Sequence, residues 1–124
     1  MMNKTLSAAL LGLAALGFNA ALAHGGGTPK HGGVVQTASD LSFELVGTPT
    51  GAVIYVEDHG KPMATAGLKG KLTVLNGSEK SEAELVPAGD KLEAKGIKLS
   101  IGAKAVATLT TPAAKAVTVR FTVR

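Results

Sequence analysis

The stretch from Gly51 to Met63 constrains the fold more than any other part of this sequence. Its first half contains Val53-Ile54-Tyr55-Val56, β-branched and aromatic residues that suit the half-buried surface of a β-strand. It then becomes polar at Asp58-His59-Gly60-Lys61-Pro62, where glycine permits a positive φ and proline cannot donate to a ladder. We therefore expect a central strand whose end delivers Asp58 and His59 to a sheet edge.

The rest of the chain after residue 33 shows the same pattern of short strands and turns. In residues 117–124, Val117, Val119, Phe121 and Val123 alternate with polar residues and are expected to face a core. Residues 41–45 alternate in the same way, and Asn76-Gly77 is the strongest hairpin signal. Turn signals at intervals of about 8–12 residues predict an all-β fold. We expect an immunoglobulin-like β-sandwich of about seven to eight short strands over residues 34–124, after an N-terminal signal helix.

Residues 1–23 have the features of a signal peptide. Lys4 supplies the positive start, an apolar run from Leu6 to Phe18 follows, and Ala21-Leu22-Ala23 forms a cleavage site of small residues. The alternative is an uncleaved membrane anchor, but Ser7, Gly12, Gly17 and Asn19 interrupt a run that is short for a span. We expect cleavage after Ala23, periplasmic localisation and no membrane contact of the cleaved chain.

Residues 24–33 contain five glycines and are expected to form a flexible leader rich in glycine and histidine. The lysines are scattered singly and the chain has no paired aromatic residues, which argues against nucleic-acid binding. The chain has no cysteine, so a blue-copper centre is excluded. None of the usual hydrolase, phosphate-loop or zinc-protease motifs is present, and we do not expect an enzyme.

The three histidines are the candidate metal ligands: His24, His31 and His59. His31 is alternatively an exposed residue of the leader, and His59 is alternatively a turn residue that bonds locally. Cleavage after Ala23 would free the α-amine of His24, which could close a chelate on Cu(II) together with its own imidazole. Met63 is the only methionine after Ala23, which argues against a Cu(I) site built on several methionines.

Five segments of the chain resemble the small N-terminal β-domain of periplasmic adaptor proteins of heavy-metal (RND-type) efflux systems, and its free-standing secreted relatives. These segments are His31-Gly32-Gly33-Val34-Val35, Phe43-Glu44-Leu45-Val46, Tyr55-Val56-Glu57-Asp58-His59-Gly60-Lys61-Pro62, Gly70-Lys71-Leu72-Thr73-Val74-Leu75 and Leu85-Val86-Pro87-Ala88-Gly89. The resemblance implies a divalent transition metal, copper or one of zinc, cobalt and nickel, and components of a metal efflux pump as partners. The chain lacks the hairpin and barrel domains of the adaptors and a dense histidine tract.

Two functions follow from these observations. The first is a secreted periplasmic accessory protein that binds a transition metal weakly and assists heavy-metal homeostasis or efflux. The alternative is a metal-free envelope interaction module that docks on a partner through a sheet edge. Residue types and spacing leave both open.

Overall fold

The computed structural model describes residues 27–124, and every regular element in this range is a β-strand. Neighbouring strands all pair antiparallel. The all-β prediction is therefore confirmed. The strands are β2 (Val34–Ala38), β3 (Leu41–Thr48), β4 (Gly51–Asp58), β5 (Lys61–Pro62), β6 (Lys69–Asn76), β7 (Glu79–Ala88), β8 (Lys91–Lys95), β9 (Lys104–Thr110) and β10 (Ala116–Thr122).

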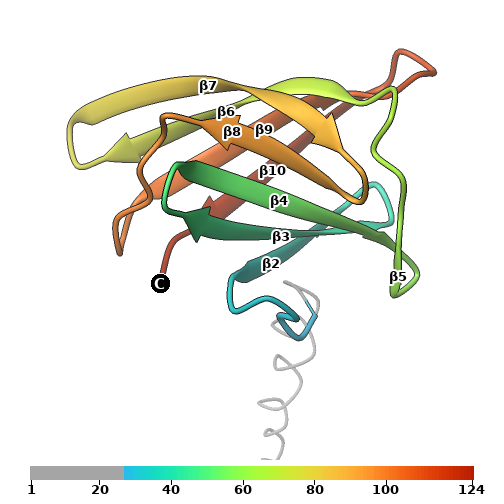
Figure 1. The fold of residues 1–124 in the computed structure, drawn as a ribbon, viewed down its shortest axis with the longest axis horizontal. Helices are drawn as coiled ribbons and strands as arrows, with labels where there is room; N and C mark the ends of the chain where they lie inside the picture. The colour runs from blue at the N-terminus through green and yellow to red at the C-terminus, as the bar shows by residue number, and fades with distance from the viewer. Residues whose placement is uncertain (1–26) are drawn as a thin grey trace, which may run out of the picture.

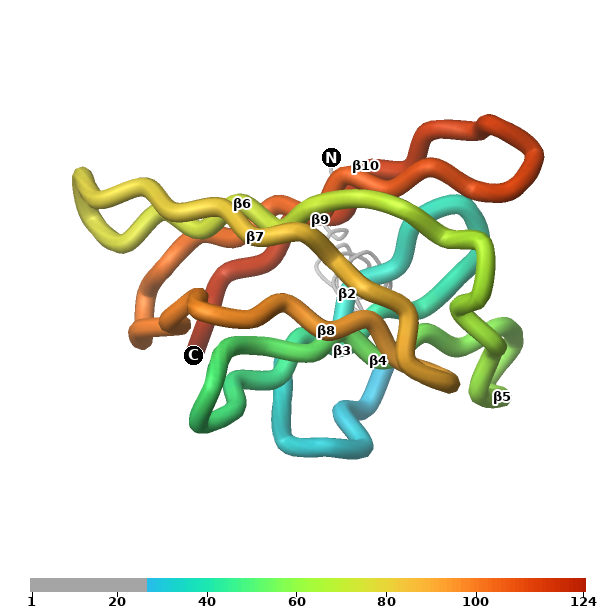
Figure 2. The backbone as a smooth tube through the Cα atoms, turned by 45° about the horizontal axis from the view of Figure 1, so that its top comes forward, coloured from blue at the N-terminus to red at the C-terminus, as the bar shows by residue number. Residues whose placement is uncertain are grey.

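The strands form one continuous sheet in the order β10-β9-β6-β7-β8-β4-β3-β2, and the short β5 pairs only with β4. Figure 1 shows this sheet curling round, so that β10 (red) returns towards β2 (blue-green). The tube in Figure 2 shows the same curled path from a second direction. β2 and β10 lie side by side but form no ladder, so the barrel-like sheet is nearly closed.

Continuity of the sheet depends on β7. Its residues 79–85 pair with β6, whereas residues 86–88 pair with β8. A single long strand therefore connects the two halves of the sheet. The immunoglobulin-like arrangement of two separate packed sheets is not confirmed, and the expected signal helix lies outside the described residues.

The alternation predicted for the last strand is confirmed. Val117, Val119 and Phe121 are buried, whereas Thr118 and Arg120 are exposed. The hairpin expected at Asn76-Gly77 is also present, although Asn76 itself still pairs with Glu79. The two turn residues are therefore Gly77 and Ser78, one position later than predicted.

The core fills the interior of the curled sheet. Ile54 of β4 and Leu92 of β8 come from one half, and Leu72 and Val74 of β6 come from the other; all four are fully buried. Burying each such side chain contributes about 1.5–3 kcal/mol. Because the core side chains come from the inward face of the sheet, the outward face of β3 and β4 is left for other contacts.

Candidate functional site

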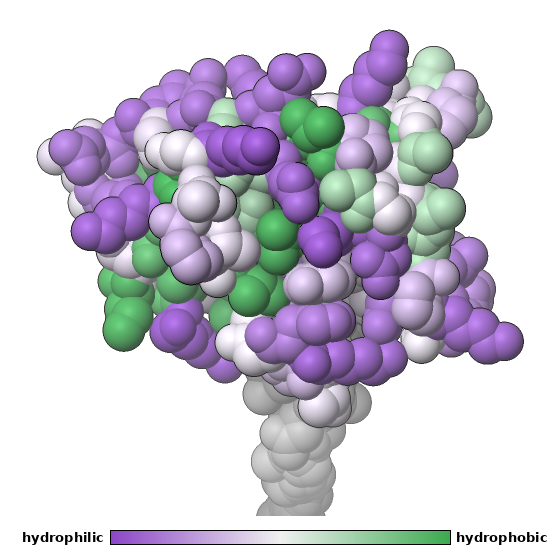
Figure 3. Space-filling model, viewed as in Figure 1, coloured by the Kyte–Doolittle hydropathy of each residue, from purple (hydrophilic) through white to green (hydrophobic). Residues whose placement is uncertain are grey.

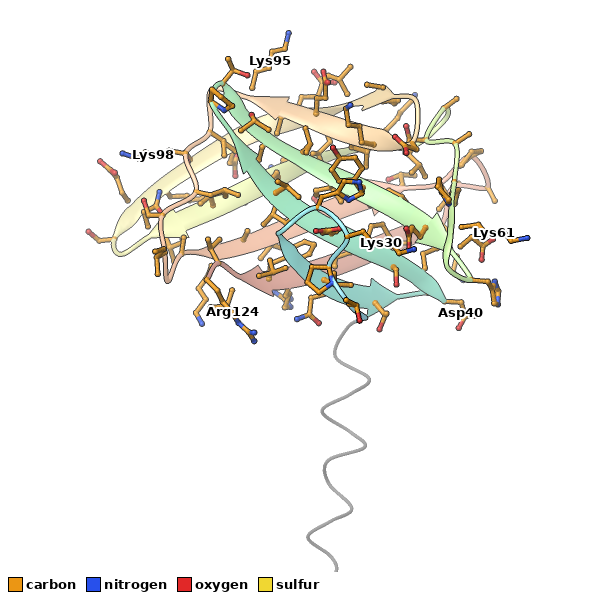
Figure 4. The ribbon with its side chains drawn as sticks, turned by 60° about the horizontal axis from the view of Figure 1, so that its bottom comes forward. Lys30, Asp40, Lys61, Lys95, Lys98 and Arg124 are labelled. Atoms are coloured by element: carbon orange, nitrogen blue, oxygen red, sulfur yellow. The ribbon has the colours of Figure 1, made fainter. Side chains whose placement is uncertain are left out.

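The segment before β2 folds back over the outer face of β3 and β4 (Figure 4). Phe43 and Leu45 point into the core, so Glu44 between them points outwards. Glu44 is nevertheless only 6 % exposed, because the segment covers it. Its carboxylate accepts hydrogen bonds from the backbone N–H groups of Lys30 at 3.0 Å, His31 at 2.8 Å and Gly33 at 2.8 Å. We call residues 27–33 with Glu44 the leader clamp.

Two glycines allow the leader clamp to form. Gly32 has φ +77°, a left-handed conformation that side chains rarely adopt. At Gly33, a Cβ atom would lie 2.1 Å from the backbone oxygen of Leu45, so no larger residue fits against β3 without displacement. The result is a concave run of N–H groups, an arrangement that binds anions. The anion here is the chain's own Glu44.

His31 is held on two sides. Its Nδ1 lies 3.0 Å from Oε1 of Glu44, and its ring stacks on Tyr55 with 3.6 Å between the ring centroids and 4° between the planes. Tyr55 reaches this position because it pairs with Glu44 in the β3–β4 ladder. An ionised carboxylate can only accept, so Nδ1 of His31 is the donor, and in the neutral form of the ring the lone pair then lies on Nε2.

The ionisation of Glu44 depends on two opposing effects. Burial by itself would raise the pKa of this carboxyl. The hydrogen bonds from the backbone of Gly33, from the ring and backbone of His31 and from the backbone of Lys30 favour the charged form, and together they hold the pKa of Glu44 below its ordinary value. The site therefore contains a buried carboxylate anion.

Lys30 ties the leader clamp to the end of β4. Its Nζ lies 2.9 Å from Oε2 of Glu57 and donates to the backbone oxygen of Gly60 at 3.2 Å. Figure 4 labels Lys30 where the segment crosses the sheet. Between the segment and the sheet lies a cavity of about 330 Å³, and its walls include Ser42, Tyr55 and Glu57.

His59 lies in the tight turn between β4 and β5. Asp58 pairs with Lys61, so His59 and Gly60 are the two turn residues, with φ values of 53° and 82°. Its Nδ1 is 2.6 Å from Oδ1 of Asp58, and the side chain is 85 % exposed. Within residues 27–124 no hydrogen bond or ring contact joins His59 to His31, and each imidazole has its own carboxylate at Nδ1.

His24, the third predicted ligand, lies outside the described residues. Among residues 27–124 no group of three or more histidine, aspartate and glutamate side chains is placed to hold a metal ion. The residue that sequence reasoning missed is Glu44. The available signal was an acidic residue on the outward face of a strand, following a glycine-rich run that contains a histidine.

The fold and this geometry define a nearly closed antiparallel sheet that carries a glycine-rich segment on a buried carboxylate, with an oriented imidazole beside it. No helix among residues 27–124 has the length and apolar character needed to cross a membrane. Protein-family models, curated proteins and solved structures gave no significant match to this chain. The resemblance to efflux adaptors therefore rests on the quoted sequence motifs.

Proposed function

We propose that the protein is secreted into the periplasm after removal of residues 1–23, binds a transition metal weakly and assists heavy-metal homeostasis or efflux. The observation that carries this proposal is the contact between Nδ1 of His31 and the buried Glu44. A metal-ligating histidine almost always donates its other ring N–H to a carboxylate, a backbone carbonyl or water, which orients the ring and raises its basicity. Stacking on Tyr55 fixes the plane of the same ring.

The proposed binding is weak because the leader clamp supplies a single imidazole. A metal on Nε2 of His31 would need further ligands, and His24 lies seven positions earlier in the chain. The α-amine and imidazole of His24 suit Cu(II). The same nitrogen ligands bind zinc, cobalt and nickel with lower affinity. His59 would act as a separate, exposed ligand. The proposed role is binding and delivery to components of an efflux pump, without catalysis.

The test is a calorimetric titration of residues 24–124 with Cu(II) and with Zn(II). We expect His31→Ala to weaken Cu(II) binding at least tenfold, and Glu44→Gln to weaken it about 10–100-fold because the ring loses its orienting partner. Glu84→Gln is the matched control, since Glu84 is exposed on β7. Equal affinities of wild type and His31→Ala would remove His31 from the site.

A second preparation tests the amino-terminal chelate. One alanine placed before His24 keeps every imidazole but moves the α-amine away from His24. We expect weaker Cu(II) binding and a changed visible spectrum. Identical affinity and spectrum would exclude the chelate while leaving His31 as the ligand.

The alternative function, a metal-free module that docks on an envelope protein through a sheet edge, is supported by a different observation. Within residues 27–124, β2 pairs only with β3, and β10 pairs only with β9. Each of these two strands therefore has one edge without a ladder. Free edges of this kind accept an added strand from another protein.

A further inference from the structure

The place where the curled sheet fails to close is a groove. β2 and β10 lie side by side there without a ladder, and the groove between them has a volume of about 960 Å³. This volume is at the upper end of the range of about 300–1,000 Å³ for ligand pockets. The walls come from β2, the end of β10, the start of β9, the leader and the connection between β8 and β9. We call this groove the seam.

The seam is basic. Its walls include Lys104, Arg120 and Arg124 and contain no aspartate or glutamate side chain. Arg120 and Arg124 are the only arginines in the chain, and both are exposed. Within residues 27–124 neither forms an ion pair or a side-chain hydrogen bond, whereas Lys104 donates to Thr122 at 3.1 Å. Arginine offers a planar fork of donors that matches a carboxylate.

The seam also has apolar walls. Val34 and Leu99, both half-buried, contribute to its lining together with Ile101, which is 87 % exposed. On the face that Figure 3 shows, apolar residues form separate patches bordered by hydrophilic ones. The occupant of the seam should therefore carry carboxylates on one side and apolar groups on the other.

We propose that the seam binds an extended acidic segment of a partner protein, which pairs with the edge of β10 near Arg120 and Arg124, where the seam separates this strand from β2. Side chains of an extended peptide alternate between two faces, so glutamates on one face can meet Arg120 and Arg124 while apolar residues on the other enter the groove. The two arginines are four positions apart and share the outward face, which sets the spacing of the carboxylates.

Other occupants fit the seam less well. A small anion would neutralise the arginines but would leave the strand edge unpaired and the apolar walls exposed to water. A second copy of this chain, docked through the same surface, would place its own Arg120 and Arg124 beside the first pair, and the like charges would repel. The inference rests on the sheet-edge alternative and needs no metal, so it stands or falls separately from the metal proposal.

The probe is a fluorescein-labelled peptide of ten residues in which valine and glutamate alternate, measured by fluorescence anisotropy in EDTA at physiological salt. We expect saturable binding to residues 24–124. The double variant Arg120→Glu with Arg124→Glu should weaken it at least tenfold. The matched control is Lys61→Glu with Lys95→Glu, which makes the same change in net charge at positions that Figure 4 shows away from Arg124.

Two further peptides separate strand addition from charge attraction. The first has alternate backbone amides N-methylated, which removes donors but keeps every carboxylate, and it should bind at least tenfold more weakly. The second alternates valine and lysine and should not bind. When the unmodified valine–glutamate peptide is added, the amide chemical-shift changes of the protein should concentrate in β2 and β10.

Several results would overturn the proposal. Equal weakening by both double variants, or equal binding of decaglutamate or a short single-stranded DNA, would show non-specific attraction. Binding that is insensitive to N-methylation would exclude strand addition. Chemical-shift changes on other strands would show that the peptide binds outside the seam. A concentration-dependent dimer in analytical ultracentrifugation would show that a second copy of the chain occupies the seam. The Cu(II) titration of His31 remains informative in each case.

Discussion

Glu44 is a charged side chain whose partners all come from one short segment 11–14 positions earlier in the chain. Replacing it by glutamine keeps the shape but places a neutral oxygen and an NH₂ group among several N–H donors. Hydrogen bonds to a charged group contribute about 1.5–3 kcal/mol. We expect Glu44→Gln to lower the free energy of unfolding by about that amount in urea denaturation at pH 7, with Glu84→Gln as the control. A change no larger than that of the control would mean that the leader clamp adds no stability.

The same variant should alter the pH dependence of stability. The pKa of Glu44 is lower in the folded protein than its ordinary value of 4.5. Its contribution is therefore fully present above about pH 4.5 and is lost as the pH falls through the folded-state pKa. Wild type should lose stability over this acid range more steeply than Glu44→Gln. Parallel curves for the two proteins would contradict the assignment.

His59 has a left-handed backbone, with φ 53°, and an exposed side chain. Alanine at this position keeps the strain of roughly 1–2 kcal/mol, whereas glycine relieves it at an entropic cost of about 0.4–1 kcal/mol. We expect His59→Ala to stay within about 0.5 kcal/mol of wild type and His59→Gly to be about 0.5–1 kcal/mol more stable than His59→Ala. A large loss in His59→Ala would instead indicate a structural hydrogen bond.

For individual residues, the sequence indicated which side chains are candidates for the site better than it indicated their contacts. His31 and His59 were identified as candidates because imidazole is a metal ligand. The role of Glu44 was missed because its nearest neighbours in sequence, Phe43 and Leu45, indicate only a strand with an outward acid. The N–H groups that enclose it lie in a glycine-rich segment whose path over the sheet no local pattern specifies.

Among the elements, β10 shows the strongest link between pattern and burial. Phe121 is 3 % exposed and contributes to the core. Phe121→Ala should lower the free energy of unfolding by about 3–5 kcal/mol, as buried aromatic truncations do. Thr118→Ala on the outward face of the same strand is the control. A loss below about 1 kcal/mol would show that the strand tolerates a cavity at this position.

The leader segment can be tested with a pair of glycines. At Gly33 a Cβ atom would meet the backbone oxygen of Leu45 at 2.1 Å, whereas at Gly27 nothing lies within 4 Å. Gly33→Ala should displace the leader from β3 and cost about 1–3 kcal/mol, in the range of overpacked sites. Gly27→Ala should change stability by less than about 0.5 kcal/mol. Equal stabilities in thermal denaturation would contradict close packing of the leader.

Most strands were predictable, and their limits were less so. Alternation identified β3 and β10, because a strand with one buried face repeats every second residue. The β-branched and aromatic run Val53-Ile54-Tyr55-Val56 identified β4. β7 extends to ten residues, because its two halves pair with different neighbours. The polar first half of β7 is paired along β6, and its exposed side chains carry no apolar periodicity.

For the whole molecule, the continuous sheet predicts cooperative unfolding. Tyr55 is the only tyrosine, the chain has no tryptophan, and Tyr55 lies on β4. Tyrosine fluorescence therefore reports one half of the sheet, whereas far-UV circular dichroism reports all strands. We expect the two urea transitions to coincide. Separate midpoints would show that the halves joined by β7 unfold independently.

The overall topology was beyond the reach of sequence patterns. Alternation and turn residues specify strands but not which distant strands pair, and the β6–β9 ladder joins distant residues such as Lys69 with Thr110 and Leu75 with Lys104. A two-sheet sandwich and a single curled sheet share the same local signals. The difference lies in the pairing of one strand, β7, with two neighbours.

Gly27 and Arg124 both line the seam, so the two limits of the described chain lie at the same groove. A short flexible linker could join them there without crossing the core, and new termini could be opened at the exposed Gly77–Ser78 turn. Such a circular permutant would keep every ladder.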